Sequence, residues 1–213
     1  MPPRFRAADI AEFARTCPFA YAAEDRSPLA GFISRRSRVD NRAVGCLRED
    51  GSADTHKLLV DMTQSIRRTF RHMARREKGI QDPIRTLQLG SGSCRDIALL
   101  MIEALRSLGI AARFVSEYVH LADDDDDDKT MIGGNIHTWV QVYVRGPRLG
   151  STSIRRAEFI GNQNLVRVAV VHEPREAIPL KGTWIGAASD HLAMKVGVKI
   201  VGGVSGTLLR PYA

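Results

Sequence analysis

One amphipathic segment, residues 94–108, constrains the fold more than any other feature of the chain. Its apolar residues recur at helical spacing, at Ile97, Met101, Ala104, Leu105 and Leu108. Ser93 can cap the start of this helix with Asp96 as the reciprocal acid of a capping box, and Gly109 can end it in a left-handed conformation. The pattern predicts a helix with one buried face, which needs a second layer of structure to cover it.

The patterns on either side of this segment supply the second layer. A helix capped by Asp54 and running to about Arg76 is expected before the central helix, and strand-like patterns follow the central helix. The strand-like patterns cover residues 110–119, 136–144, 165–172 and 192–201. Helices followed by strands indicate an α+β fold, in which a largely antiparallel sheet packs on the central helix that carries Cys94.

The segment before Asp54 shows little periodicity. We expect residues 1–53 to form an irregular N-terminal segment with one short helix at 7–16, and residues 54–213 to form a single folded domain. The first residues contain no apolar run of the kind found in a secretory signal, and no later stretch is long and apolar enough to span a membrane. We therefore expect a cytoplasmic protein with no membrane partner.

The net charge of +7 raises the question of nucleic-acid binding. The arginines of residues 67–76 share the expected first helix with apolar residues at helical spacing, so we predict that they mostly form its solvated face. The chain contains no nucleic-acid-binding motif. A basic nucleic-acid binder is therefore only the third hypothesis for function, and nucleic acid is not an expected partner.

Neither the acidic residues nor the cysteines predict a metal site. Six consecutive aspartates, Asp123 to Asp128, lack the alternating ligand spacing of a calcium loop, so a solvated and self-repelling loop is favoured. The three cysteines, Cys17, Cys46 and Cys94, contain no C-x-x-C pair and are too few for a disulfide framework. We expect reduced thiols and no metal or other cofactor.

Cys94 has two interpretations that its local sequence leaves open. At the first position of a helix, free backbone N–H groups stabilise a thiolate and can bind an oxyanion, and the small residues 90–93 let a substrate approach closely. Ser93 and Gln88 are candidates for the oxyanion site and substrate groove. However, Cys94 also shares the core-facing stripe with Ile97 and Met101, where cysteine is commonly a small buried hydrophobe.

A nucleophilic cysteine needs a base, which is usually a histidine. Among the six histidines, His137 stands out because it opens an alternating strand pattern that places it on one face with Trp139. We expect this face to lie against the helix of Cys94, with Trp139 lining the substrate groove or packing in the core. His137 is then either the base or a hydrogen-bonded structural histidine.

Two stretches resemble the bacterial transglutaminase-like superfamily, whose members share a papain-related cysteine catalytic arrangement. They are "GSGSCRDIALLMIEALRSLGIAARFVSEY" and "HTWVQVYV". The resemblance extends more loosely over residues 54–200. It implies a transglutaminase-like or cysteine-protease fold, with Cys94 as the nucleophile and His137 as its base.

The sequence departs from this family at the third catalytic residue. In the family that residue is an aspartate in an "FDPTN"-like strand, but no aspartate lies between Arg145 and Gly161 here. Alignment from either flank gives Ser153 or Ile154 at its position. Glu158 is the only acid of the tract, and it is the candidate orienting acid if the loop folds differently from the family. We interpret the tract as either a compensated reading-frame change or a divergent loop.

Two hypotheses for function follow. In the first, the protein catalyses cysteine acyl transfer, or amide or peptide hydrolysis, through an acyl-thioester on Cys94, with activity reduced by the missing aspartate. Its partner is then a protein or peptide that offers a glutamine side chain or a peptide amide. In the second, the protein is a catalytically inactive member of the family that acts as a peptide-binding or interaction module. The sequence indicates no oligomeric state.

Overall fold

The structure is a computed structural model that describes residues 10, 12–39, 53–75, 77, 79–119, 130–131, 136–144, 152–154, 165–178, 185–187 and 198–199. Its helices are α1 (Ala23–Ile33), α2 (Thr55–Thr69), α3 (Pro83–Leu89) and α4 (Cys94–Ser107), with short 3-10 turns η2 (Glu12–Ala14) and η4 (Pro174–Ala177). The main strands are β5 (Ala112–Val119), β7 (Ile136–Val142), β8 (Thr152–Ile154) and β9 (Leu165–Val171). Shorter strands are β1 (Thr16–Cys17), β2 (Ala53–Asp54), β3 (Arg71–His72), β4 (Ser91–Gly92), β6 (Thr130–Met131) and β10 (Val198–Lys199).

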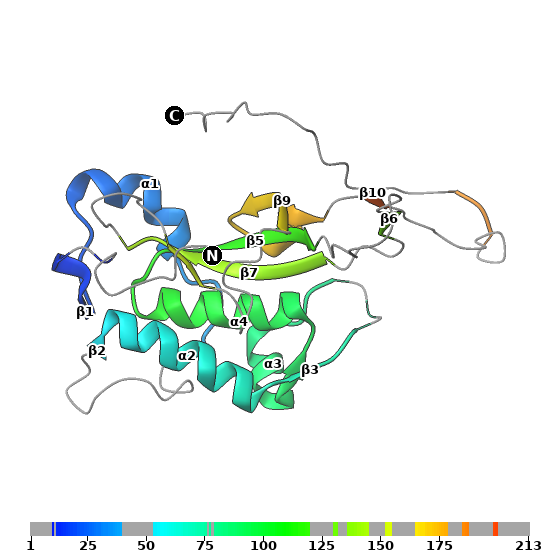
Figure 1. Cartoon of the computed structure of the whole chain (residues 1–213), viewed down its shortest axis with the longest axis horizontal. Helices are drawn as coiled ribbons and strands as arrows, with labels where there is room; N and C mark the ends of the chain where they lie inside the picture. Colours follow the sequence, from blue (N-terminus) through cyan, green and yellow to red (C-terminus); the bar gives the residue numbers. More distant parts are fainter. Residues whose placement is uncertain are drawn as a thin grey trace.

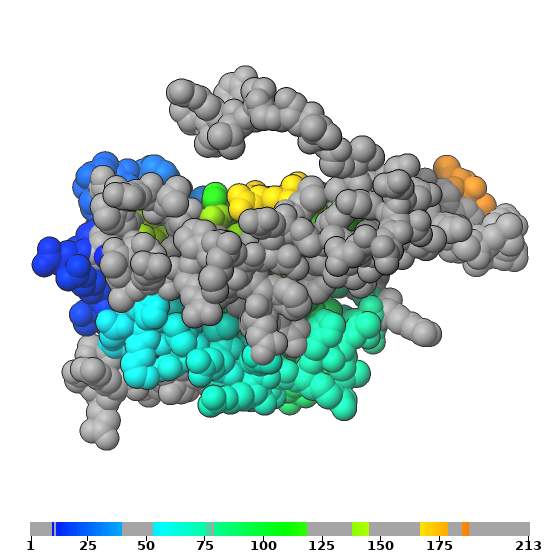
Figure 2. All heavy atoms as spheres, in the orientation of Figure 1, coloured from blue at the N-terminus to red at the C-terminus, as the bar shows by residue number. Residues whose placement is uncertain are grey.

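The main elements form three layers. Figure 1 shows α4 between the sheet that contains β5, β7 and β9 on one side and α2 and α3 on the other. The four sheet strands have the order β8-β7-β5-β9, and each neighbouring pair is antiparallel. In the space-filling view of Figure 2, α2 and the segment that follows it form the lower surface. The prediction of an α+β fold with an antiparallel sheet packed on a central helix is confirmed.

Helix α4 is central because it is buried along most of its length. Its predicted apolar stripe packs with Phe114 of β5 and with Val140 and Val142 of β7. The predicted capping box is present, and Gly109 has a φ of 75° just beyond the last turn, a conformation that glycine adopts without strain. The start, the buried face and the end of this helix therefore follow the sequence pattern.

Helix α2 begins as predicted but ends early. The Asp54 carboxylate accepts a hydrogen bond from the Lys57 N–H at 2.7 Å, and the expected apolar side chains are buried. The expected continuation to about Arg76 is wrong, because the helix stops at Thr69 and β3 pairs in parallel with β4. Met73, an apolar residue within the expected continuation, is 42% exposed. Backbone pairing with the loop before α4 thus replaces the last helical turns.

A short helix, α3, was not predicted between α2 and α4. The Asp82 carboxylate caps it by accepting from the Ile84 N–H, Pro83 occupies its first position, and Gly90 ends it with a φ of 60°. These are ordinary helix start and stop residues. The local sequence therefore contained the information for α3, although its seven residues show no clear apolar stripe.

The expectation of an irregular tract at 17–53 is wrong for residues 23–33, which form α1. None of the residues of α1 is buried and Pro28 lies inside it, so the sequence offers neither an apolar stripe nor an uninterrupted helical pattern. Within the helix expected at 7–16, the described residues contain the turn η2 and Thr16, the first residue of β1, but no α-helix. Further along, β1 pairs with β2.

The described N-terminal residues pack on the same core as the rest of the chain. Cys17 and Val39 belong to the core cluster that contains the α4 stripe. The Tyr21 hydroxyl donates to the Tyr143 carbonyl oxygen at 2.8 Å and accepts from the Ala111 N–H at 2.9 Å. The division into two segments at residue 53 stays a prediction, but the two segments share one hydrophobic core.

A buried ion pair ties α4 to the N-terminal segment. The Arg106 guanidinium donates to the Glu103 carboxylate at 3.0 Å, and both side chains are almost fully buried. The other Glu103 oxygen accepts from the backbone N–H groups of Arg36 and Ser37, each at 2.8 Å. Further Arg106 N–H groups donate to the carbonyl oxygens of Phe32, Ala112 and His172. The outer face of α4 therefore holds the chain that follows α1.

Several sequence-based expectations concern residues outside those described. The run Asp123–Asp128 and most of the strand expected at 192–201 are among them; from that strand, the structure describes only β10, which pairs with β6. Strands β5, β7 and β9 lie close to their predicted ranges, whereas β8 was not predicted. Across the described residues, no helix combines the length and the hydropathy needed to cross a bilayer.

Candidate functional site

Cys94 is the first residue of α4, and its thiol is half-buried. The loop before it is fixed by backbone pairing, because Arg71 N–H donates to the Gly90 carbonyl at 2.8 Å and Met73 N–H to that of Gly92 at 2.9 Å. A Cβ at Gly92 would lie 2.9 Å from the Cβ of Asp96, so the loop and helix approach too closely for a side chain there. The small residues of the loop thus permit close packing against the helix start.

Asp96 fixes the start of α4 with four hydrogen bonds. One carboxylate oxygen accepts from the Ser93 N–H and hydroxyl, each at 2.8 Å. The other accepts from the Gln81 N–H at 2.7 Å and the Arg75 guanidinium at 2.8 Å. Burial would raise the pKa of Asp96, but the hydrogen bonds from Gln81, Ser93 and Arg75 outweigh it and hold the pKa below its ordinary value. An ionised carboxylate paired with Arg75 therefore anchors the residues around Cys94.

We expect Asp96→Asn to lower the free energy of unfolding by about 2–3 kcal/mol at pH 7, because an amide N–H₂ would face donors on one side of the group. A lowered folded-state pKa contributes stability above the unfolded-state pKa of about 3.9, and this contribution is lost as pH falls through the folded-state pKa. The difference between wild type and variant should therefore shrink towards pH 3 in urea unfolding experiments. Asp61→Asn, which removes a surface partner of Lys57, should cost less than about 1 kcal/mol. A loss of equal size for Asp96→Asn at both pH values would contradict the assignment.

Cys94 lines a small pocket at the junction of α2, α4 and β7. The lining residues are Thr63 and Ile66 of α2, Cys94, Ile97, Ala98 and Met101 of α4, and Thr138, Trp139 and Val140 of β7. The pocket volume is about 20 Å³, which is room for one water-sized group. The Thr138 hydroxyl is buried and has no hydrogen-bond partner among the described residues. The thiol therefore faces a narrow, largely apolar space between the central helix and the sheet.

His137 lies immediately before the part of β7 that lines this pocket. In the antiparallel register it pairs with Glu117 of β5. The Glu117 carboxylate is buried, with one oxygen 3.7 Å from the Arg167 Nε atom. Its other oxygen has no hydrogen-bond partner within the described part of the chain. The sheet thus brings a buried acid to the strand position beside His137.

The other predicted site residues occupy different places. Trp139 is buried and lines the pocket with Cys94, and the Arg167 guanidinium lies over its ring, 5.6 Å from the centroid. The β7 side chains in the core cluster with α4 are Val140 and Val142, which alternate with Trp139 along the strand, so the expectation that the face of Trp139 lies against α4 is wrong. Gln88 is exposed on α3 and does not line the pocket, whereas Ser93 caps α4. Glu158 lies outside the described residues.

Sequence reasoning missed three residues of this region. Arg75 was assigned to a solvated helix face, but it lies beyond the end of α2 and pairs with Asp96. Thr138 and Glu117 were not singled out, because their importance depends on the register between β5 and β7. A tight hairpin would have fixed that register, but a long connection separates the two strands.

Residues 47–150 match the family model described as the transglutaminase-like superfamily. The matched range contains α4, which begins at Cys94, and β7, which carries His137. This match, which covers just under half of the chain, indicates a transglutaminase-like fold. The match ends at residue 150. It therefore does not include residues 151–161, where the resemblance led us to expect the third catalytic residue and where the sequence has no aspartate.

Comparisons with individual proteins agree with this assignment. An uncharacterized protein of Mycobacterium leprae (strain TN) is 31% identical over 105 residues, which are 49% of this chain and 36% of that protein. A crystal structure from Cytophaga hutchinsonii, named as that of a "Putative Cysteine Protease", has a TM-score of 0.56 and 18% identity, covering 78% of this chain and 53% of that chain. The predicted transglutaminase-like, cysteine-protease fold is therefore confirmed. This transglutaminase-like chain spans about a third of the curated relative and about half of the solved one.

Proposed function

We propose that the protein catalyses acyl transfer or amide hydrolysis with Cys94 as the nucleophile and His137 as the base. The observation that carries the proposal is the position of the Cys94 thiol at the first residue of α4, in a pocket shared with the β7 residues directly after His137. A helix N-terminus favours the thiolate, and its free N–H groups are suited to an oxyanion.

The proposed reaction has two halves. The Cys94 sulfur attacks an amide carbonyl carbon, the carbonyl oxygen takes the negative charge beside the Cys94 N–H, and His137 carries the thiol proton. The C–N bond then breaks, the leaving ammonia or amine takes that proton from the imidazolium, and an acyl-thioester remains. In the second half, water or a primary amine attacks the thioester while His137 accepts its proton, which restores the thiol as the tetrahedral intermediate collapses.

We assign the role of orienting acid to Glu117 rather than to Glu158. Side chains at paired positions of antiparallel strands have Cβ atoms about 4.5–5.5 Å apart, within reach of a glutamate, and Glu117 pairs with His137. A buried carboxylate oxygen requires a hydrogen-bond donor, and one oxygen of Glu117 has none among the residues that this structure describes. We propose that the imidazole N–H of His137 becomes that donor when the site reacts. In this arrangement Glu117 takes the place of the missing aspartate. It does so from β5, which lies on the other side of β7 from β8.

The proposed substrate is a protein or peptide. The pocket beside Cys94 has room for a water-sized group only, so the body of a substrate has to remain on the surface. Two exposed apolar side chains flank the loop there, Met73 at 42% and Leu89 at 47% exposure. Met73 N–H bonds to Gly92 and Leu89 precedes Gly90, so both lie at the approach to the thiol. Apolar side chains of a polypeptide substrate are suitable partners for them.

The second candidate is an inactive transglutaminase-like protein that binds peptides without cleaving them. The absence of an aspartate between Arg145 and Gly161 favours it. The packing of the sheet on α4 also favours the inactive protein. Val140 and Val142 pack on α4, whereas the Trp139 ring lies next to Arg167. His137 alternates with Val140 and Val142 in the same way as Trp139, so its strand position is on the face that does not pack on α4. The two candidates differ in one respect, which is covalent chemistry at Cys94.

We expect the purified protein to attach a fluorescent primary amine to dimethylated casein, or to release ammonia or peptide fragments from untreated casein. Each product should fall to background in Cys94→Ala, because no thioester can form without the thiol. Gel fluorescence, an ammonia assay and mass spectrometry measure the three products. If wild type and Cys94→Ala give equal signals in all three assays, while both still bind casein, the inactive binding protein becomes the preferred assignment.

A further inference from the structure

A second cavity lies on the opposite side of α4 from Cys94. Its volume is about 460 Å³, and it is enclosed by the outer face of α4 and by residues 36–37, 79–83 and 172–178. None of the described residues lines both this cavity and the Cys94 pocket. Cavities of this size commonly hold small organic molecules.

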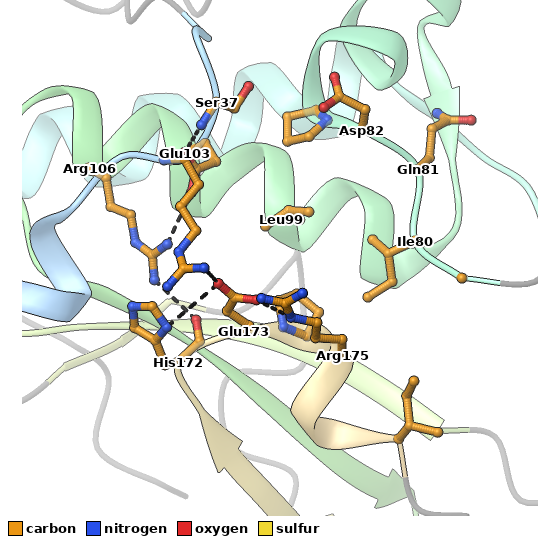
Figure 3. A pocket seen from close by; sticks show the side chains of 15 residues that line it. Ser37, Ile80, Gln81, Asp82, Leu99, Glu103, Arg106, His172, Glu173 and Arg175 are labelled. Carbon is orange, nitrogen blue, oxygen red and sulfur yellow. Dashed lines mark hydrogen bonds and ion pairs between the residues drawn. The ribbon is translucent and has the colours of Figure 1, made fainter. Parts of the chain in front are cut away.

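The walls of this cavity are largely apolar. In Figure 3, Leu99 of α4 and Ile80 lie across the cavity from Glu173 and Arg175. The other apolar lining residues are Pro83, Pro174 and Ile178. These side chains come from three separate segments of the chain, so they surround the space rather than form one flat patch. A ligand with an apolar body fits such walls.

One ion pair in the wall is already satisfied within the protein. Glu103 and Arg106 bind each other and several backbone groups, as the dashed lines of Figure 3 partly show. Both side chains are almost fully buried, and desolvation lowers the pKa of Arg106 while Glu103 opposes that shift. This pair forms part of the structure and leaves the charge of the cavity to other residues.

The charged residues that line the cavity sum to zero, but two of its arginines gather around one carboxylate, that of Glu173. The Glu173 carboxylate contacts two guanidinium groups, those of Arg36 and Arg175, whose side chains are 53% and 72% exposed. Arg36 makes this contact through one terminal nitrogen and Arg175 through Nε, so both retain N–H donors. The Asp82 carboxylate accepts from the Ile84 N–H at the start of α3. One carboxylate shared by two arginines leaves a charge suited to an anionic group.

We propose that this cavity binds a small amphipathic anion, with an aromatic or branched aliphatic body between Leu99 and Ile178 and one carboxylate or sulfonate at Arg36 and Arg175. The site is separate from Cys94. It therefore stands or falls independently of the proposed acyl-transfer activity.

The test uses the full chain and two matched fluorescent probes. Anilinonaphthalene sulfonate carries an apolar ring system and one sulfonate, and phenylnaphthylamine has the same rings without the sulfonate. We expect the sulfonate to bind with one-to-one stoichiometry in isothermal titration calorimetry, at least about tenfold more tightly than the uncharged probe. Arg36→Ala combined with Arg175→Ala should remove that preference, whereas Arg68→Ala, an exposed arginine on α2, should leave it unchanged.

A cavity-filling variant locates the bound probe. Leu99→Trp should abolish sulfonate binding while the melting temperature shows that the protein is folded, and Ile178→Trp is the replacement if Leu99→Trp does not fold. Cys94→Ala should bind as wild type. Equal affinity for the two probes, or binding that survives both the double arginine variant and the filled cavity, would overturn the proposal. Casein labelling plays no part in these measurements, so their outcome is distinct from that of the proposed reaction.

Discussion

Iodoacetamide should alkylate Cys94 rapidly below pH 7, and this rapid reaction should disappear in His137→Ala. In the proposed mechanism, a His137 imidazolium and the N-terminus of α4 together stabilise the thiolate that reacts with the reagent. Without His137 the rate should rise only at higher pH. The extent of modification at each pH is measured by mass spectrometry of the peptide that contains Cys94.

Cys17 is an internal control in the same experiment. It is fully buried, and burial raises its pKa to about 11, so its peptide should stay unmodified in the folded protein at all of these pH values. Glu117→Gln should move the low-pH rise of the Cys94 rate, because a neutral amide stabilises imidazolium less than a carboxylate does. A Cys94 profile that is slow below pH 7 and identical in wild type and His137→Ala would mean that no thiolate–imidazolium pair exists.

Glu103→Ala should be among the most destabilising single changes in the protein, at about 3–5 kcal/mol of unfolding free energy. It leaves the Arg106 guanidinium buried without its carboxylate, and it leaves the Arg36 and Ser37 N–H groups without an acceptor. Each loss is costly because these groups are shielded from water. Urea unfolding at pH 7, followed by circular dichroism, measures the change.

A paired substitution separates the loss of charge balance from the loss of packing. Glu103→Leu combined with Arg106→Met should recover part of the stability lost in Glu103→Ala, because no unpaired charge then remains buried. Glu77→Ala removes a 74% exposed partner of Arg75 and should change stability by less than about 1 kcal/mol. If the Glu103 and Glu77 variants unfold at similar urea concentrations, the buried pair has little energetic role.

The parts of the fold that follow local sequence were predictable. The start and end of α4 depend on Ser93, Asp96 and Gly109, whose interactions involve only residues close to them in the sequence. The apolar face of α4 follows from the spacing of its own residues. The end of α2 could not be predicted in the same way, since Thr69 is followed by a strand that exists only because the loop at Gly90–Gly92 lies beside it. Helix α1 was hidden for another reason, because it buries none of its side chains.

The candidate site divides along the same line. Cys94 could be proposed as a nucleophile from sequence because Ser93 and Asp96 predict that a helix begins there. The capping box in the structure confirms that position. Its surroundings come from distant segments, since Thr63 and Ile66 belong to α2 and Thr138 to β7. The pairing of Glu117 with His137 depends on a register that the hydrophobic alternation of two strands leaves undetermined. The roles of Glu117 and His137 stay predictions.

The Tyr21 hydroxyl, which bridges Ala111 and Tyr143, bears on where one evolutionary unit ends in this chain. The family match begins at residue 47, yet residues before it complete the hydrogen bonding at one end of the sheet and fill sites in the core. A piece cut at the edges of the match would expose those sites to water. Recombination could therefore move the matched segment to a new protein only if the recipient supplied an equivalent covering segment. The segment that has to be transferred as a unit is therefore longer than the segment that the family match covers.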